Sequence, residues 1–381
     1  MKKFLSVTLS LLLAASMPLS ALAETYDLAQ GSITVNAESG GQTVRQGGGA
    51  AVPDSAPVIT GTSKENTVTI NAEKDQTANV TLSGANIDGS NTVKAAVSTT
   101  GEGNVSIELD GDSTLKSGFS HAGLEKNNGG SLTITDEDKN GKLTAEGGGY
   151  GAGIGGGNRG TGSDITISGG EVNATGGAYG AGIGGGCGDS GSDITISGGE
   201  VKATGGVNGA GIGGGCYRDG NNITVSSDAK LKVQGGVEDD TDGAGAGIGN
   251  GGSNAYGSQI PGAEVEPDTS GLTTGRIEYY APGADMDKDA PSQTIVGTYI
   301  PPQPAREAAA PAQPTAPLYR VTDGDGKDVS YETTWRDGVL TVTVEADRAT
   351  LTGRLSGIAS LQAQGIERIV FITKGATSEF L

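Results

Sequence analysis

Two glutamates recur in register in the middle of this chain. Glu171 and Glu200 occupy the same position in two nearly identical segments, and Lys142 and Lys230 flank them in the same series. Paired carboxylates can act as acid and base in glycosidic bond cleavage. The Lys-Glu-Glu-Lys order is instead typical of charge balance on a solvated face. We therefore expect no enzyme, with a polysaccharide lyase or glycoside hydrolase as the minor alternative.

Two aspartates, Asp164 and Asp193, also recur in register, each just before a β-rich segment. Asp and Asn at such corners usually hydrogen-bond the local backbone. Stacked carboxylates repel unless a cation or a neighbouring amide relieves them, and Ca²⁺ prefers oxygen ligands. The pattern favours turn residues. Ca²⁺ is the only candidate cofactor, with this pair as its weak candidate site.

Aromatic and basic residues are the candidates for sugar contact. Tyr150 and Tyr179 are 29 residues apart, and pyranose rings stack on such rings. By strict alternation, however, both tyrosines share parity with inward-pointing alanine and isoleucine, so they are either core-edge fillers or sugar contacts. Tyr217 beside Arg218, and Arg159 in the equivalent turn region, complete the carbohydrate-binding candidates together with Glu171 and Glu200.

The two cysteines, Cys187 and Cys216, are also one period apart, so stacked repeats would place them directly over one another. In an exported protein such a pair forms either a disulfide or a stack of small apolar thiols, and the sequence leaves both alternatives open. His121 is the only histidine and has no histidine or cysteine series beside it. Zinc or triad chemistry therefore has no support.

A repeat of 29 residues positions all of these groups. YGAGIGGG begins at Tyr150 and at Tyr179, and DITISGGEV begins at Asp164 and at Asp193. Within one repeat, Ile165 and Ile167 alternate with polar residues, as in a strand with one buried face, and Gly pairs separate short strands. Repeats of this length stack into solenoids. The sequence predicts an all-β fold, a right-handed parallel β-helix of about seven coils.

Stacked coils should place equivalent residues in inward-pointing columns. Neighbouring residues within a column should be about 4.8 Å apart. We expect two such columns in the apolar core. The first comprises Leu82, Ile107, Ile134, Ile167, Ile196 and Val225, and the second comprises Ile87, Leu115, Leu143, Val172, Val201 and Leu231.

Composition changes divide the chain into five parts. Lys2 and Lys3 before an apolar run, and Ala21-Leu22-Ala23 after it, predict a signal peptide over 1–23. A cap region over 24–57 and the β-helix over 58–298 follow. A Pro/Ala-rich linker over 299–317 precedes a small α+β module over 318–381, with a helix near 355–364.

Charge and hydropathy limit the partners. Loss of Lys2 and Lys3 would change the net charge from −20 to −22, which disfavours nucleic acid and anionic membranes. No second apolar run is long enough to span a bilayer. We expect a secreted or cell-surface protein.

The motifs TYDLAQGSITV, LDGDSTLKSG, HAGLEKN, ITISGGEV and GIERIVFITKGATSEF are spread along the mature chain, and the resemblance that they carry covers nearly all of it. Together they resemble secreted Gly-rich repeat proteins of Gram-positive gut bacteria that are labelled carbohydrate-binding-domain proteins. The resemblance implies a pectin-lyase-like β-helix and contact with polysaccharide, without a catalytic motif. We expect a non-catalytic binding module for a polysaccharide or cell-surface glycan. The alternative is a structural or adhesive exoprotein that binds no sugar.

Overall fold

The computed structural model describes residues 23–240, 242–255, 258–297, 319–336, 338–353, 366 and 368–380. The expected linker and all but the last residue of the expected signal peptide lie outside these ranges. The chain divides into two compact units, Met1–Tyr299 and Ile300–Leu381.

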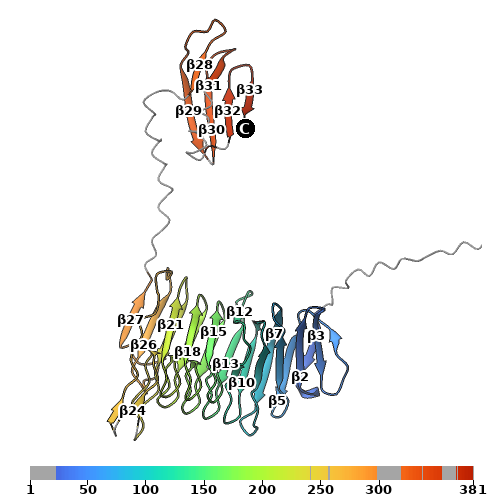
Figure 1. The fold of residues 1–381 in the computed structure, drawn as a ribbon, viewed down its shortest axis with the longest axis vertical. Helices are drawn as coiled ribbons and strands as arrows, with labels where there is room; N and C mark the ends of the chain where they lie inside the picture. Colours follow the sequence, from blue (N-terminus) through green and yellow to red (C-terminus); the bar gives the residue numbers. More distant parts are fainter. Residues whose placement is uncertain are drawn as a thin grey trace, which may run out of the picture. The chain divides into compact units, whose positions relative to one another are not determined.

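The first unit is a parallel β-helix, in which successive coils stack from the blue to the orange part of the chain (Figure 1). One side of the coils is formed by a ladder of parallel strands in a 10-stranded sheet. Each successive coil contributes one strand to this ladder. Among the described residues this ladder contains β2 (Ile33–Glu38), β6 (Val68–Ala72), β8 (Val97–Gly101), β11 (Leu124–Lys126), β14 (Ile154–Gly155), β17 (Ile183–Gly184), β20 (Ile212–Gly213) and β23 (Ile248–Gly249).

A 15-stranded sheet supplies the other two sides of the coils, and its two halves meet at the long strand β7 (Thr77–Asp88). One half runs through β9 (Asn104–Asp110), β12 (Leu132–Thr135), β15 (Gly162–Ile167), β18 (Gly191–Ile196) and β21 (Gly220–Val225). The other runs through β10 (Asp112–Lys116), β13 (Lys142–Glu146), β16 (Glu171–Thr175), β19 (Glu200–Thr204), β22 (Lys230–Gln234), β26 (Arg276–Tyr280) and β27 (Gln293–Val296). The later coils therefore have three short strands each.

The start of the β-helix lies earlier than expected. Strand β1 (Thr25–Asp27) pairs in parallel with β5 (Val58–Ser63), and β2 pairs in parallel with β6, so residues 24–57 already contribute coil strands. The same stretch adds the antiparallel strands β3 (Gly41–Gln46) and β4 (Val52–Pro53) and a short 3-10 helix, Leu28–Gln30. The expected count of about seven coils is too low, because the first coils lack the Ala-Gly-Ile signature that made later coils recognisable.

The core is a continuous column of buried aliphatic side chains, but its register corrects the predicted columns. Ile107 pairs with Val80, whereas Leu82 pairs with Leu109. Likewise Leu115 pairs with Ala145. Both errors are shifts of two residues. A two-residue shift keeps a side chain on the same face of a strand, so alternation alone cannot detect it.

Glycine is required where neighbouring coils contact each other through the backbone alone. Gly155, Gly184, Gly213 and Gly249 stack in register with φ of 132–138°. A Cβ on Gly184 would lie 2.1 Å from the carbonyl oxygen of Gly213. No L side chain fits this backbone, so the Gly-rich part of the repeat is a consequence of packing.

The second unit contains a four-stranded sheet in the order β29 (Tyr331–Arg336), β30 (Val339–Val344), β32 (Arg368–Ile372) and β33 (Thr377–Phe380). Strands β28 (Tyr319–Thr322) and β31 (Thr350–Gly353) form an antiparallel pair. Its core contains Val321, Leu340, Val342, Val344, Ile366 and Phe371. The helix expected near 355–364 lies outside the described residues.

Candidate functional site

An aromatic strip lies on turns of successive coils, and we define it as Phe119, Tyr150, Tyr179 and Tyr217. The rings of Tyr150 and Tyr179 are stacked, with centroids 5.5 Å apart and an interplanar angle of 18°. The ring of Phe119 meets Tyr150 edge-on at 4.9 Å. Both tyrosines are half-buried. Glycines before each tyrosine interrupt the strand alternation, so the parity argument for inward rings does not apply there.

Both ends of the aromatic strip are open to solvent. Phe119 is 64% exposed and Tyr217 is 53% exposed. Tyr217 follows Cys216, whose N–H donates to the carbonyl of Tyr179. The Tyr217 hydroxyl donates to Asp242 at 2.5 Å, and this hydrogen bond, more than burial, raises the pKa of Tyr217 to about 12. The sequence interpretation missed Phe119, because its degenerate coil has no tyrosine at the equivalent position.

In the third coil, Asn208 occupies the position equivalent to Tyr150 and Tyr179, and Tyr217 lies in the following turn of the same coil. Asn208 is fully buried, and its Nδ2 donates to the carbonyls of Asp242 and Gly243 at 3.2 and 2.8 Å. The backbone at Asp242 and Gly243 therefore covers this position.

The two candidate arginines lie in turns next to the strip. Arg159 has a left-handed backbone (φ 58°), and its N–H donates to the carbonyl of Cys187. Arg218 Nε donates to the carbonyl of Gly188 at 2.8 Å. Since the N–H of Cys187 in turn donates to the Tyr150 carbonyl, the arginine turns and the aromatic turns are joined through backbone hydrogen bonds.

Cys187 and Cys216 form a disulfide between adjacent coils, with Cα atoms 4.9 Å apart. Cys216 is 1% exposed. The bond closes one 29-residue coil onto the next, directly beside the aromatic strip. Of the two alternatives left open by the sequence, the structure contains the disulfide.

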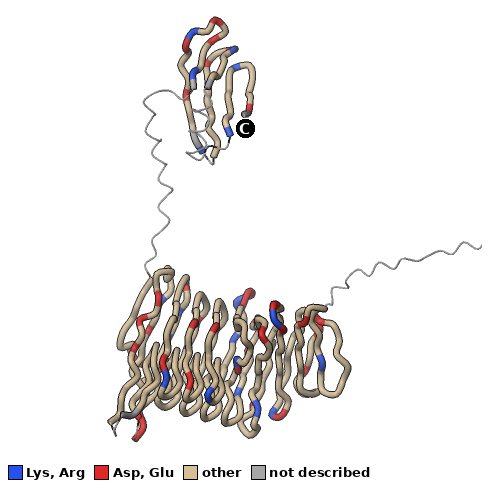
Figure 2. Tube along the Cα trace, in the orientation of Figure 1, with Lys and Arg blue, Asp and Glu red and all other residues tan. Residues whose placement is uncertain are grey.

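The glutamates lie apart from the aromatic turns, at outward positions of β16 and β19. Glu171 and Glu200 are register neighbours, and each carboxylate is paired with a lysine: Lys142 at 2.7 Å and Lys230 at 2.5 Å. The hydrogen bond from Lys142 lowers the pKa of Glu171. Figure 2 shows Lys and Arg interspersed with Asp and Glu along the coils. These pairs act as exposed ion pairs between coils.

The aspartates sit at corners with left-handed backbone. Asp164 and Asp193 have φ of 57° and 55°, a conformation that Asp and Asn tolerate better than most residues. Asp193 accepts hydrogen bonds from Asn222 Nδ2 and from Ser192 Oγ. An amide neighbour thus relieves the carboxylate on one side. In the described part of the chain, no group of three or more His, Cys, Asp or Glu is arranged to hold a metal ion.

A family model described as "Beta helix repeat" matches residues 139–158, 165–187 and 194–216. Its matches coincide with the coils that carry the repeated strands and Gly-rich turns. Together with the stacked coils, these matches support a parallel β-helix repeat fold for the first unit. No curated protein and no solved structure matches it.

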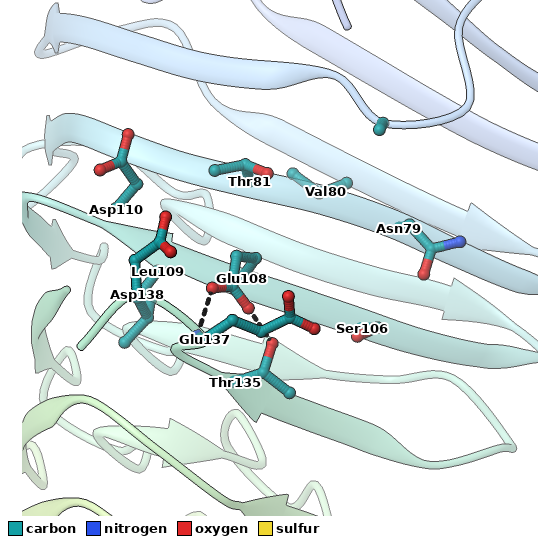
Figure 3. A pocket seen from close by; sticks show the side chains of 11 residues that line it. Asn79, Val80, Thr81, Ser106, Glu108, Leu109, Asp110, Thr135, Glu137 and Asp138 are labelled. Carbon is teal, nitrogen blue, oxygen red and sulfur yellow. Dashed lines mark hydrogen bonds between the residues drawn. The ribbon is translucent and has the colours of Figure 1, made fainter. Parts of the chain in front are cut away.

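Elsewhere on this β-helix, the sequence interpretation missed a shallow hollow of about 410 Å³. Strands β7 and β9 and the connection after β12 form it, and Figure 3 shows its carboxylates, Glu108, Asp110, Glu137 and Asp138. Glu108 accepts from Thr135 Oγ1 and from the N–H of Glu137; Asp110 accepts from Ser83 Oγ at 2.8 Å. The acidic run 136–138 was its only sequence signal. The two hydrogen bonds to Glu108 hold the connection after β12 against strand β9 of the preceding coil.

A second feature of the β-helix that the sequence interpretation missed is the polar strand β11. It lies one coil before the stacked glycines that begin with Gly155. Glu125 pairs in register with Gly155 and is 6% exposed, and Lys126 is 7% exposed. Lys126 Nζ donates to the carbonyl of Asn128 at 2.9 Å, and burial lowers the pKa of Lys126. Glu125 is the partner of His121. The sequence interpretation considered only histidine and cysteine as partners of His121 and so missed this carboxylate.

The described part of the chain contains no helix long and apolar enough to cross a membrane.

Proposed function

We propose that this protein is a secreted or cell-surface, non-catalytic β-helix module that binds a neutral polysaccharide along the aromatic strip. The observation that carries the proposal is the series of ring contacts from Phe119 through Tyr150 to Tyr179 on successive coils, with Phe119 and the nearby Tyr217 more than half exposed. Exposed aromatic rings offer large apolar faces with little conformational freedom to lose on binding.

Charge supports a neutral ligand over an acidic one. The chain has a net charge of −20, so a polyanionic glycan would be repelled at long range. The strip itself is flanked by Arg159 and Arg218, whose guanidinium groups can donate hydrogen bonds to sugar oxygens. The repeat spacing of about 4.8 Å suits a ligand that extends across several coils.

Export is consistent with the disulfide. Bonds of this kind persist in oxidising compartments and are rare in the cytosol, and the Cys187–Cys216 bond lies directly beside the strip. Expression with the native N terminus, followed by mass determination of the protein in the medium, tests export. Cleavage after Ala23 is the expected result.

Binding is tested by affinity electrophoresis and pull-down with cellulose, xylan, mannan, mixed-linkage β-glucan and chitin. Phe119→Ala is expected to weaken binding about tenfold, because it removes the most exposed ring of the strip. Val296→Ala is the matched control, since Val296 is an apolar side chain 66% exposed on strand β27, at the other end of the coil stack from β1. Equal binding by both variants would contradict a role for the strip. Retention of the wild type on no glycan would favour the structural or adhesive alternative.

An enzymatic role is tested on the same panel with polyuronides added. Release of no reducing or unsaturated product is expected, since Glu171 and Glu200 are held in ion pairs with lysines.

A further inference from the structure

His121 is the chain's only histidine, and a buried carboxylate holds it in place. Its Nδ1 lies 2.8 Å from Glu125 Oε2, and the side chains are 31% and 8% exposed, respectively. The histidine backbone is also fixed, because its N–H donates to the Gly118 carbonyl and its carbonyl accepts from the N–H of Gly148 in the next coil. The ring is therefore partly open to solvent but held at one edge.

The hydrogen bonds of Glu125 decide which histidine nitrogen carries the proton. Its Oε2 accepts the N–H of Ala122 at 3.0 Å, and its Oε1 accepts Asn127 Nδ2 at 2.8 Å. A carboxylate with donors on both oxygens is an acceptor, so Nδ1 of the neutral ring must donate to it. Nε2 then keeps its lone pair, and no other hydrogen bond to the ring occurs within the described ranges.

This acceptor lies at the N-terminal end of the aromatic strip. Phe119 is two residues earlier in the same turn, and its ring packs edge-on against Tyr150 at 4.9 Å. The turn thus presents an exposed apolar ring and a fixed acceptor close together. A sugar ring has complementary groups: an apolar face of C–H groups that can pack on the aromatic ring, and hydroxyl groups at its edge that can donate to the acceptor.

We propose that His121 is a specificity-determining residue of the strip, with Nε2 accepting a hydrogen bond from a hydroxyl of a bound neutral glycan. Glu125 is its positioning residue and holds the Nδ1–H tautomer. This role rests on the proposed function. In addition to stacking on the aromatic rings, the ligand would have to place a hydroxyl donor at the N-terminal end of the strip.

The tautomer is measured on the whole protein by long-range ¹H–¹⁵N correlation, in which a single histidine gives an unambiguous signal. At mildly alkaline pH, Nδ1 is expected to show a protonated-type shift and Nε2 an unprotonated-type shift. Glu125→Gln supplies an amide that can donate, so it should reduce the Nδ1–H population. A protonated Nε2 in the wild-type protein would overturn the proposal. On addition of a polysaccharide that retards the protein, the Nε2 shift should move, and an unchanged shift would also overturn it.

Two variants separate the ring nitrogens. His121→Gln can place an oxygen near the Nε2 position, whereas His121→Asn keeps a group only near Nδ1. Affinity electrophoresis in xylan, mannan and mixed-linkage β-glucan should show binding within about threefold of wild type for His121→Gln and about tenfold weaker for His121→Asn. The opposite order, or no loss with His121→Asn, would reject the role of His121 while leaving the strip intact. A wild-type protein that binds none of these glycans overturns both proposals.

Discussion

The late coils and the early coils of the β-helix solve the same stacking problem differently. From Tyr150 onward, the close contact between coils is made by backbone alone, through Gly155, Gly184, Gly213 and Gly249. One coil earlier the same rung carries Glu125 and its hydrogen-bonded neighbours. The regular part therefore leaves little room for side-chain chemistry. The histidine–carboxylate pair lies where the regularity begins, whereas the late coils carry their candidate ligand contacts in the turns.

The two regions also treat charge differently. In the late coils, the ion pairs Lys142–Glu171 and Glu200–Lys230 are exposed and join neighbouring coils. In the earlier coil, Glu125 and Lys126 are buried, and buried Thr99 and Asn128 bond one another at 2.7 Å. Buried polar groups are costly unless every partner is in place, whereas exposed pairs contribute little either way. Substitutions should accordingly have very different effects in the two regions.

The largest effect is expected where a close backbone contact coincides with a positive φ. Gly184→Ala places a Cβ 2.1 Å from the Gly213 carbonyl oxygen at a φ of 132°, and should cost roughly 3–5 kcal/mol of unfolding free energy. The matched early-coil variant is Gly111→Ala. It has a φ of 66° with nothing within 4 Å of its Cβ, and should cost about 1 kcal/mol. Urea unfolding of both variants measures the difference, and equal losses would contradict the comparison.

Breaking the disulfide should come next. It closes a coil of 29 residues, and its removal should cost roughly 3 kcal/mol, concentrated in the late coils. Hydrogen exchange is the measurement: protection should fall around Tyr179 and Cys216 and remain in β8 and β11. The Cys187→Ala/Cys216→Ala double variant should match the reduced wild type and be insensitive to reductant. Uniform loss of protection along the β-helix would show that the two regions unfold as one unit.

The buried lysine tests the polar early coil. Lys126→Met keeps the length of the side chain and removes a buried charge, and should stabilise the protein by about 1–2 kcal/mol at neutral pH. Burial lowers the pKa of Lys126 below the unfolded value of 10.5. At pH values between the folded and the unfolded pKa, the unfolded state therefore binds more protons than the folded state. Wild-type stability should therefore rise with pH towards 10.5, and the advantage of the variant should shrink.

Denaturant titrations of wild type and Lys126→Met at several alkaline pH values provide the check. An advantage that does not change with pH would mean that the lysine charge is not the source of the difference.

The smallest effect is expected at the exposed end of the strip. Tyr217→Phe loses the hydrogen bond to Asp242, but the side chain is 53% exposed, so the cost after solvent screening should stay below about 1 kcal/mol. The folded pKa of about 12 lies above the unfolded value of 10.0. The stabilisation is thus fully present below pH 10.0 and is lost as pH rises through 12. The stability difference between wild type and variant, followed over that range, should vanish; a constant difference would be the contrary result.

The sequence predicted the later coils well and the early ones poorly. Perfect copies at Tyr150 and Tyr179 fixed their own register, because in-register stacking follows from an exact period. In the degenerate copies, Leu82 and Leu115 were each placed two residues from their true partners. Phe119 and Glu125 were missed for the same reason: neither recurs, and the period was the main guide to position.

What the sequence determined by itself is the architecture: strand alternation, Gly pairs and a 29-residue period leave few folds other than a stacked solenoid. Only the tertiary structure decided which side chains meet. The pairing of His121 with Glu125, the edge-on contact of Phe119 with Tyr150 and the burial of Lys126 depend on how one irregular coil fits against a regular one. A period specifies distances between equal residues. Contacts between unequal residues arise only from three-dimensional packing.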